Sequence, residues 1–240
     1  PRIVPDARKL PVVSFEEMLE MAASGAGVLQ LRSVEYARNY GVRIHCRSSF
    51  DEGPGTLVTG EDETMERPLV TAVTHSSAEA RVTLTGVRDE PGIAGSIFSA
   101  LADANINVDM IIQNEPVADD AKADLSFTVP RAEMDAARQA IEALGAGEAV
   151  QTDEAIGKVS IVGAGMRSHP GVAAKVFRTL GENGINIEMI STSPIKISCV
   201  IDSGRVPEAV QALHAAFELG EDAIRPEDTA GDHRPTVSSS

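Results

Sequence analysis

Two short segments of the chain place groups that could bind the carboxylate of a small molecule. Asp89-Glu-Pro-Gly92 and Ser168-His-Pro-Gly171 each bring Pro and Gly to the start of a predicted helix, with Pro at its first position. Glycine lets a ligand approach the backbone closely, and the free N–H groups of a first helical turn attract anions. The same pattern is typical of a helix start with no ligand, so these turns alone do not decide the function.

The strands predicted after these helices begin with an amide and an acid. The two strand heads are Ile106-Asn-Val-Asp109 and Ile185-Asn-Ile-Glu188. Asn offers a donor and an acceptor together, and an Asp or Glu carboxylate can meet an ammonium group. A turn that binds a carboxylate and a strand head that binds ammonium would form a receptor for a zwitterion. The alternative is that Asp109 and Glu188 are solvated strand ends.

Both features belong to one phrase that occurs twice, 79 residues apart. Residues 91–111 return as 170–190, with nine of the 21 positions identical and most others conservative. Two similar supersecondary units predict one fold used twice and two similar sites.

The elements around each phrase follow the order of a ferredoxin-like unit. In the first copy we predict strands over 81–87, 107–113, 123–129 and 148–153, and helices from 92 to about 104 and over 131–144. This βαββαβ order is an α+β fold. In the second copy we predict strands over 159–164, 186–192 and 196–201 and helices over 171–183 and 205–217, but no fourth strand.

An apolar strand over 69–74 precedes the first copy and has no partner there. Because an open sheet edge invites pairing, we expect residues 68–75 to complete the second sheet. The first domain, 76–154, would then be an insertion in the second domain, which consists of 68–75 and 155–228.

Residues 1–50 are typical of the end of a larger α/β domain. They predict a helix over 14–23, capped by Ser14 with Glu17 at its third position, a helix over 28–40 and a strand over 42–47, without an obvious core. Residues 51–67 predict a linker or irregular loop, and 229–240 a disordered tail. The chain begins without Met, which suggests a piece of a longer protein, and Met65 could be an internal start.

The composition argues against several classes of function. A net charge of −15 argues against nucleic acid or an anionic membrane as partner. No apolar stretch is long enough to span a membrane and no secretion signal is present, so we expect a cytoplasmic protein. The two cysteines and five histidines lack metal-site spacing, and catalytic motifs are absent. We therefore expect no catalytic residue, metal or cofactor in this chain, and His214 at the surface or boundary of its helix.

The sequence also resembles a known family. Asp-x-Pro-Gly, a helix and Ile-Asn-(Ile/Val)-(Asp/Glu) are similar to the ACT domain, an amino-acid-binding regulatory module. Longer phrases resemble the C-terminal part of bacterial aspartokinases, namely residues 1–9, 15–18, 31–37, 159–171 and 190–193. The resemblance covers nearly the whole chain except about the final ten residues.

The resemblance implies a part of a larger enzyme. Aspartokinases phosphorylate L-aspartate to 4-phospho-L-aspartate with MgATP, the first step toward lysine, threonine and methionine. Their N-terminal kinase domain opens with Lys-Phe-Gly-Gly-Thr, which this chain lacks, so the chain alone is expected to be the inactive regulatory part. The end of the nucleotide-binding segment would comprise Pro1, Arg2, Ile3, Val4 and Pro5. The alternative is a stand-alone ACT-type amino-acid-sensing dimer without a kinase partner.

The resemblance also implies two effector sites between the subunits of a homodimer. The first would comprise Asp89, Gly92, Ile93, Ala94 and Gln113, facing Asn186 and Ile187 of the partner subunit. The second would comprise Ala173, Ala174, Ser193 and Pro194, facing Asn107, Val108 and Asp109. In similar proteins these sites take threonine and lysine respectively, and inhibition needs both.

Several points stay open at this stage. The residues leave open which site takes which amino acid and whether inhibition is concerted. Ala173 stands where a relative can carry Thr, so the second site would lose a hydroxyl contact. A heterotetramer with separate catalytic subunits is the other assembly implied. In either assembly, effectors would favour a closed, inactive arrangement by a population shift.

Overall fold

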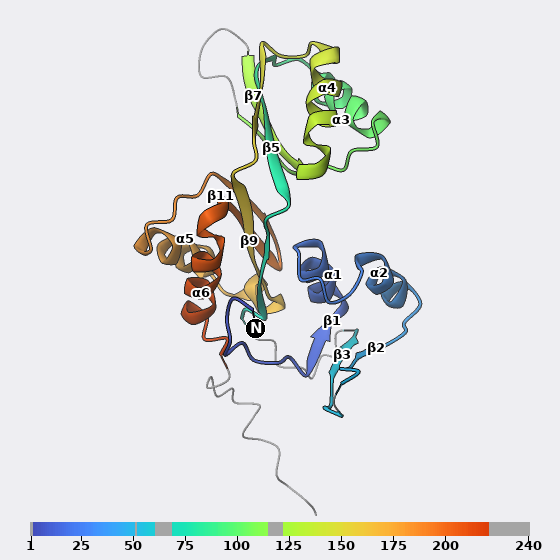
Figure 1. The fold of residues 1–240 in the computed structure, drawn as a ribbon, viewed down its shortest axis with the longest axis vertical. Coiled ribbons are helices and arrows are strands. Elements are labelled where there is room, and N and C mark those ends of the chain that lie inside the picture. Colours follow the sequence, from blue (N-terminus) through green and yellow to red (C-terminus); the bar gives the residue numbers. More distant parts are fainter. Residues whose placement is uncertain (1, 51, 61–68, 115–121, 221–240) are drawn as a thin grey trace, which may run out of the picture.

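The domain that contains the first copy of the repeated phrase, hereafter the first repeat, consists of an antiparallel sheet and two helices. In the computed structural model, which describes residues 2–50, 52–60, 69–114 and 122–220, it contains β5 (Glu79–Arg88), α3 (Ile93–Asp103), β6 (Asp109–Gln113), β7 (Lys122–Pro130), α4 (Met134–Leu144) and β8 (Ala149–Asp153). The strand order is β6-β7-β5-β8. Helices α3 and α4 lie on the same side of this sheet (Figure 1). The predicted βαββαβ fold is confirmed.

Alternating burial explains why this sheet forms. Along β5 the side chains of Ala80, Val82 and Leu84 are fully buried, and the residues between them are half-buried. Ile97 and Leu101, one helical turn apart in α3, are fully buried against the same core. The sheet and helix thus each contribute one apolar face.

The second repeat contains β9 (Ile156–Val162), α5 (Val172–Glu182), β10 (Met189–Ser193), β11 (Lys196–Asp202) and α6 (Val206–Ala216). Its strand order is β10-β11-β9-β4, in which β4 (Ala72–Ser76) pairs antiparallel with β9. Strand β4 thus holds the position that β8 holds in the first sheet, and the pairing predicted for the upstream strand is present. Residues 68 and 221–228 of the predicted domain, and the predicted tail 229–240, lie outside the described residues.

The N-terminal residues fold into a small unit of β1 (Val12–Ser14), α1 (Phe15–Ala23), α2 (Leu31–Asn39), β2 (Ile44–Cys46) and β3 (Thr56–Thr59). Strand β3 lies between β1 and β2, parallel to the first and antiparallel to the second. The prediction of a linker over 51–67 is therefore wrong for 56–59, while residues 51 and 61–67, including Met65, lie outside the described residues. The unit also has a core, which we did not expect, formed by Val13, Phe15, Met18, Val34 and Val58.

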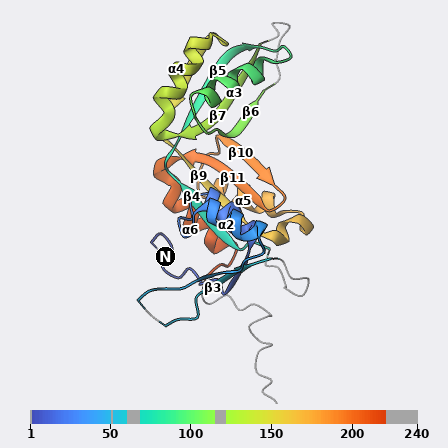
Figure 2. The same ribbon diagram turned by 90° about the vertical axis from the view of Figure 1, so that its right-hand side faces the viewer.

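Helix α1 connects this unit to the second repeat. Ser14 caps the helix and Glu17 completes the predicted capping box, because each side chain bonds the other's backbone N–H. The second oxygen of Glu17 accepts hydrogen bonds from the Thr71 hydroxyl at 2.6 Å and the Ala164 N–H at 3.0 Å. Accordingly, the unit lies beside the second repeat, and the first repeat lies at the far end of the molecule (Figures 1 and 2).

The two repeats meet through a small apolar cluster. Met110 of β6 and Met189 of β10, which are equivalent in the repeated phrase, pack with Ile156 and Val200, all buried. The junction between the repeats thus forms next to the two strand heads for which the sequence predicts ligand binding. Among the described residues, no helix is both long and apolar enough to cross a membrane.

Candidate functional site

Both strand-to-helix turns bend at a glycine in the left-handed conformation. Gly92 has φ 97° and Gly171 has φ 98°, and each immediately precedes the first helical residue. Pro91 and Pro170 therefore lie two residues before the first helical residue, and the prediction of Pro at the first helical position is wrong. The reason is that a glycine with positive φ sets the helix direction, a conformation that residues with a Cβ adopt only with strain.

The start of α3 keeps backbone donors for an anion. Neither α3 nor α5 has a side-chain cap, and the first N–H groups of any helix lack an acceptor within it. The Ile93 N–H donates a hydrogen bond to the Glu90 carbonyl at 3.3 Å. Ala94, which is half-buried, and Gly95, which is exposed, follow it in the first turn of the helix. This end of α3 suits a carboxylate, and the exposed Asp89 precedes it.

Three of the predicted residues of the first site meet in one hollow. It has a volume of about 10 Å³ and is lined by Ile93, Ala94 and Gln113 together with Val87, Ile97, Ala123 and Leu125. A space of this size holds at most one water. An amino acid bound here would therefore lie at the mouth, over the helix start, rather than inside.

The strand heads of the two repeats have the same pattern of exposure. Asn107 and Asn186 are exposed, Val108 and Ile187 are half-buried, and the acids that follow are exposed. Regular pairing starts only at Asp109 in β6 and at Met189 in β10, so the predicted strands begin two or three residues too early. The pairing of Asn186 and Ile187 with the first turn of a second subunit stays a prediction.

Each strand-head acid binds a basic side chain of the other repeat. Asp109 Oδ2 lies 2.7 Å from Lys158 Nζ on β9, and Glu188 Oε2 lies 2.6 Å from the Arg81 guanidinium on β5. Lys158 is only 4% exposed and also lies 2.6 Å from Glu79 Oε1. Asp109 Oδ1 accepts the N–H of Met110 at 2.9 Å. Both predicted ammonium-binding acids thus already have basic partners within the chain. Neither the prediction of an ammonium site nor the alternative of a solvated strand end included these ion pairs.

Charge and burial compete at this junction. Burial acts to raise the pKa of the Asp109 carboxyl, but the hydrogen bond and charge of Lys158 outweigh it, and the pKa lies below its ordinary value. Burial acts to lower the pKa of Lys158, but Glu79 and Asp109 hold it above its ordinary value. Both groups are therefore charged at neutral pH.

The predicted residues of the second site are spread over two elements of the second repeat. Ala173 and Ala174 lie in the first turn of α5, half-buried and exposed. Ser193 ends β10, and Pro194 follows in the tight turn to β11, where the Ser193 hydroxyl accepts the Ile195 N–H at 3.4 Å. Because these residues lie on separate elements, their grouping into one site stays a prediction.

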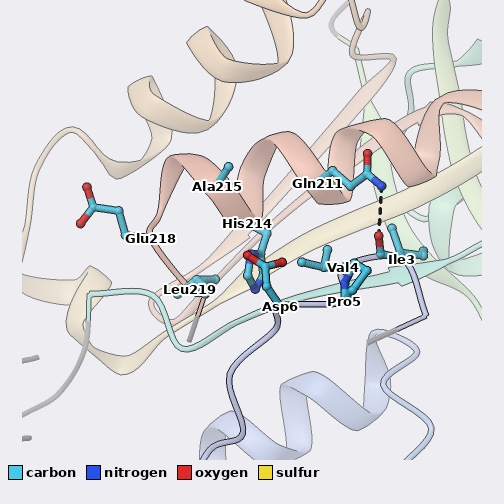
Figure 3. A pocket seen from close by; sticks show the side chains of 10 residues that line it. Ile3, Val4, Pro5, Asp6, Gln211, His214, Ala215, Glu218 and Leu219 are labelled. Atoms are coloured by element: carbon cyan, nitrogen blue, oxygen red, sulfur yellow. Dashed lines mark hydrogen bonds between the residues drawn. The ribbon is translucent and has the colours of Figure 1, made fainter. Parts of the chain in front are cut away.

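The segment predicted to end a nucleotide site lies along α6. Val4 is buried in the core of the second repeat, and the Ile3 carbonyl accepts a hydrogen bond from Gln211 at 3.0 Å. Ile3, Val4 and Pro5 line one side of a recess of about 670 Å³ (Figure 3). Arg2 is exposed, and Pro1 lies outside the described residues. The segment thus links the N-terminal unit to the second repeat.

His214 lies on the α6 side of the same recess and is 8% exposed. The prediction of a surface or boundary position is wrong, because Leu219 and residues 3–6 cover this end of α6. Burial lowers the pKa of the imidazole, although the nearby Asp6 carboxylate opposes this.

Sequence reasoning missed Lys158, Arg81 and the second role of Glu17. Lys158 gave one signal, since it is the only charged residue in the apolar segment 156–162. A charge in a fully buried strand needs a partner, although the sequence does not show which. No group of three metal-binding side chains occurs among the described residues.

Comparison with known families adds to this geometry. A family model described as the ACT domain matches residues 82–144 and 159–217. An aspartokinase of Mycolicibacterium smegmatis is 52% identical over 230 residues, which are 92% of this chain and 54% of that protein. The chain spans about half the length of the curated relatives it matches.

Solved structures show the same likeness. The ligand-free regulatory subunit of aspartate kinase from Thermus thermophilus has 40% sequence identity and a TM-score of 0.58, and covers 62% of this chain and 99% of its own. E. coli aspartokinase III in complex with lysine and aspartate has 26% identity and a TM-score of 0.72, over 90% of this chain and 48% of its own.

Proposed function

Since the chain belongs to the ACT-domain family and is the regulatory region of an aspartokinase, we propose that it controls a kinase converting L-aspartate to 4-phospho-L-aspartate. The observation that carries this is the match of both repeats and the N-terminal unit to aspartokinases about twice as long. MgATP would be a substrate of the whole enzyme, bound largely outside this chain, and the enzyme would act in the cytoplasm.

The effectors proposed are threonine at the first site and lysine at the second, giving feedback inhibition. The open helix start behind Gly92 and the hollow beside Ala94 and Gln113 support the first site. A lysine complex of E. coli aspartokinase III supports lysine as one effector.

Two assemblies would complete the sites. One is a homodimer through the repeats, in which the first turn of one subunit faces Asn186 and Ile187 of the other. The other is a heterotetramer of such dimers with catalytic subunits, which a solved structure of aspartokinase alpha and beta subunits supports.

The alternative is a stand-alone amino-acid-sensing dimer without a kinase partner. One observation favours it in the form of an independent regulatory subunit that starts at Met65. The regulatory subunit of Thermus thermophilus corresponds to only 62% of this chain. Mass spectrometry of the endogenous protein separates these forms, because a stable product that begins at Met65 would identify a separate subunit. The high similarity over 92% of the chain favours the attached form.

Calorimetry with threonine and lysine tests the proposed effectors. We expect both amino acids to bind the wild-type chain, and Asp89→Ala and Asn186→Ala each to weaken threonine more than lysine. Glu90→Ala, next to Asp89 and also exposed, is the matched control and should change neither affinity. Absence of binding heat with both amino acids would refute the proposal.

A further inference from the structure

The junction between the repeats holds more acid than base. Lys158 Nζ lies between two carboxylates of the first repeat, at 2.6 Å from Glu79 and 2.7 Å from Asp109. Arg81 likewise lies between Asp153 at 2.9 Å and Glu188 at 2.6 Å. One ammonium shared by two carboxylates leaves an excess negative charge, on which the positive charge of Lys196 also acts.

The two carboxylates that hold Lys158 differ in what they can still accept. Glu79 Oε2 is buried and has no hydrogen-bond partner among the described residues. Asp109 is reachable from outside, because its side chain is 54% exposed, against 13% for Glu79. A buried acceptor without a donor costs free energy. Glu79 would therefore be stabilised if the Lys158 ammonium left Asp109 and bonded only to Glu79.

We propose that Lys158 is an internal occupant of the ammonium-binding position at Asp109, and that the amine of an effector replaces it there while Lys158 moves onto Glu79. This rests on the proposed function, since it concerns the site that Asp109 belongs to. After the exchange, two ammonium groups face the two carboxylates, one on Asp109 and one on Glu79.

The exchange couples ligand binding to the contact between repeats. Lys158 belongs to the second repeat, and Asp109 to the strand head of the first, so the bond between them holds the repeats together. An amine at Asp109 breaks this bond and leaves the Glu79–Lys158 pair as the remaining contact of that lysine. The ligand thereby changes the junction rather than only filling a pocket.

Two variants are expected to change affinity in opposite directions. Lys158→Met removes the internal ammonium, and we expect lysine to bind roughly tenfold more tightly in calorimetry on the full chain. Glu79→Gln removes the alternative partner, leaves Lys158 on Asp109, and should weaken lysine binding by a similar factor. Both variants disturb the same junction, so a merely structural effect would shift both affinities the same way.

Lys122→Met is the control, because Lys122 also pairs with an acid, Glu148 at 2.8 Å, but within the first repeat. The Lys122→Met variant should bind lysine with the same affinity as the wild type. If the wild type binds lysine and the Lys158→Met and Glu79→Gln variants both weaken or both leave binding unchanged, the proposal about Lys158 is overturned. If the wild type binds neither amino acid, the proposed function itself fails.

Discussion

Replacing Glu17 by alanine should loosen α1 from the second repeat. The Glu17 side chain is buried, and its Oε1 accepts the Thr71 hydroxyl at 2.6 Å and the Ala164 N–H at 3.0 Å. Its Oε2 accepts the Ser14 hydroxyl at 2.9 Å and the Ser14 N–H at 3.3 Å. One carboxylate thus holds a helix start and two segments of the neighbouring sheet domain.

The cost of the substitution follows from the donors that lose their acceptor. Thr71 and Ala164 are both buried, and a buried donor without a partner costs about 1–3 kcal/mol. Loss of the capping box adds about 1 kcal/mol. Since some donors will find water, we expect Glu17→Ala to lower the free energy of unfolding by roughly 3–5 kcal/mol.

Urea unfolding followed by far-ultraviolet circular dichroism measures this loss. Glu16→Ala is the matched control, because Glu16 lies in the same first turn but is less buried and makes none of these bonds, and it should cost less than about 1 kcal/mol. Hydrogen exchange at the Ala164 amide should also become faster in Glu17→Ala. Equal losses in the two variants, or unchanged exchange at Ala164, would refute the reasoning.

Three further outcomes are expected. The pKa of Asp109 is lowered in the folded chain, so its pair with Lys158 stabilises the fold above about pH 4 and is lost as the pH falls through the folded pKa, which urea unfolding at several pH values would measure. Burial raises the pKa of Cys199 to about 12, so a thiol-alkylating reagent should label the half-buried Cys46 and spare Cys199 in the folded chain, as read by mass spectrometry. Gly163→Ala should lower the thermal midpoint, because a Cβ there would lie 2.5 Å from a backbone carbonyl oxygen.

Each of these outcomes has a control. Asp109→Asn should lose a smaller part of its stability than the wild type as the pH falls below about 4, and an equal loss in the two proteins would contradict the pairing with Lys158. Labelling of Cys199 without denaturant would contradict its burial. Gly60→Ala, where a Cβ has no neighbour within 4 Å, should leave the midpoint unchanged.

Local patterns in the sequence were enough to predict most elements. The capping box of Ser14 and Glu17 involves residues three apart, so the sequence contains all of its information. The alternation in β5 and the duplicated phrase predicted both sheets for the same reason. The pairing of β4 followed from counting strands, because the second repeat lacked one.

The features that were missed depend on residues far apart in the chain. Strand β3 has only Leu57 and Val58 as large apolar residues. It forms because it pairs with β1, and this pairing between distant residues leaves no local signal in the sequence. The partners of Asp109 and Glu188 were missed for the same reason, since they come from the other repeat. Sequence reasoning found the acids but could not know that the fold already supplies them with bases.

The insertion of one repeat within the other has a consequence for biosynthesis. Strand β4 leaves the ribosome long before its partner β9, and the whole first repeat lies between them. The first repeat can fold while β4 waits, and its β5 and β8 then pair, with Arg81 opposite Asp153, which brings the two loose ends together. Shortening the open loop about tenfold in this way reduces the entropic cost of closing the second sheet by roughly 2 kcal/mol. A defect in the first repeat should therefore slow maturation of the second, even where the second carries no change.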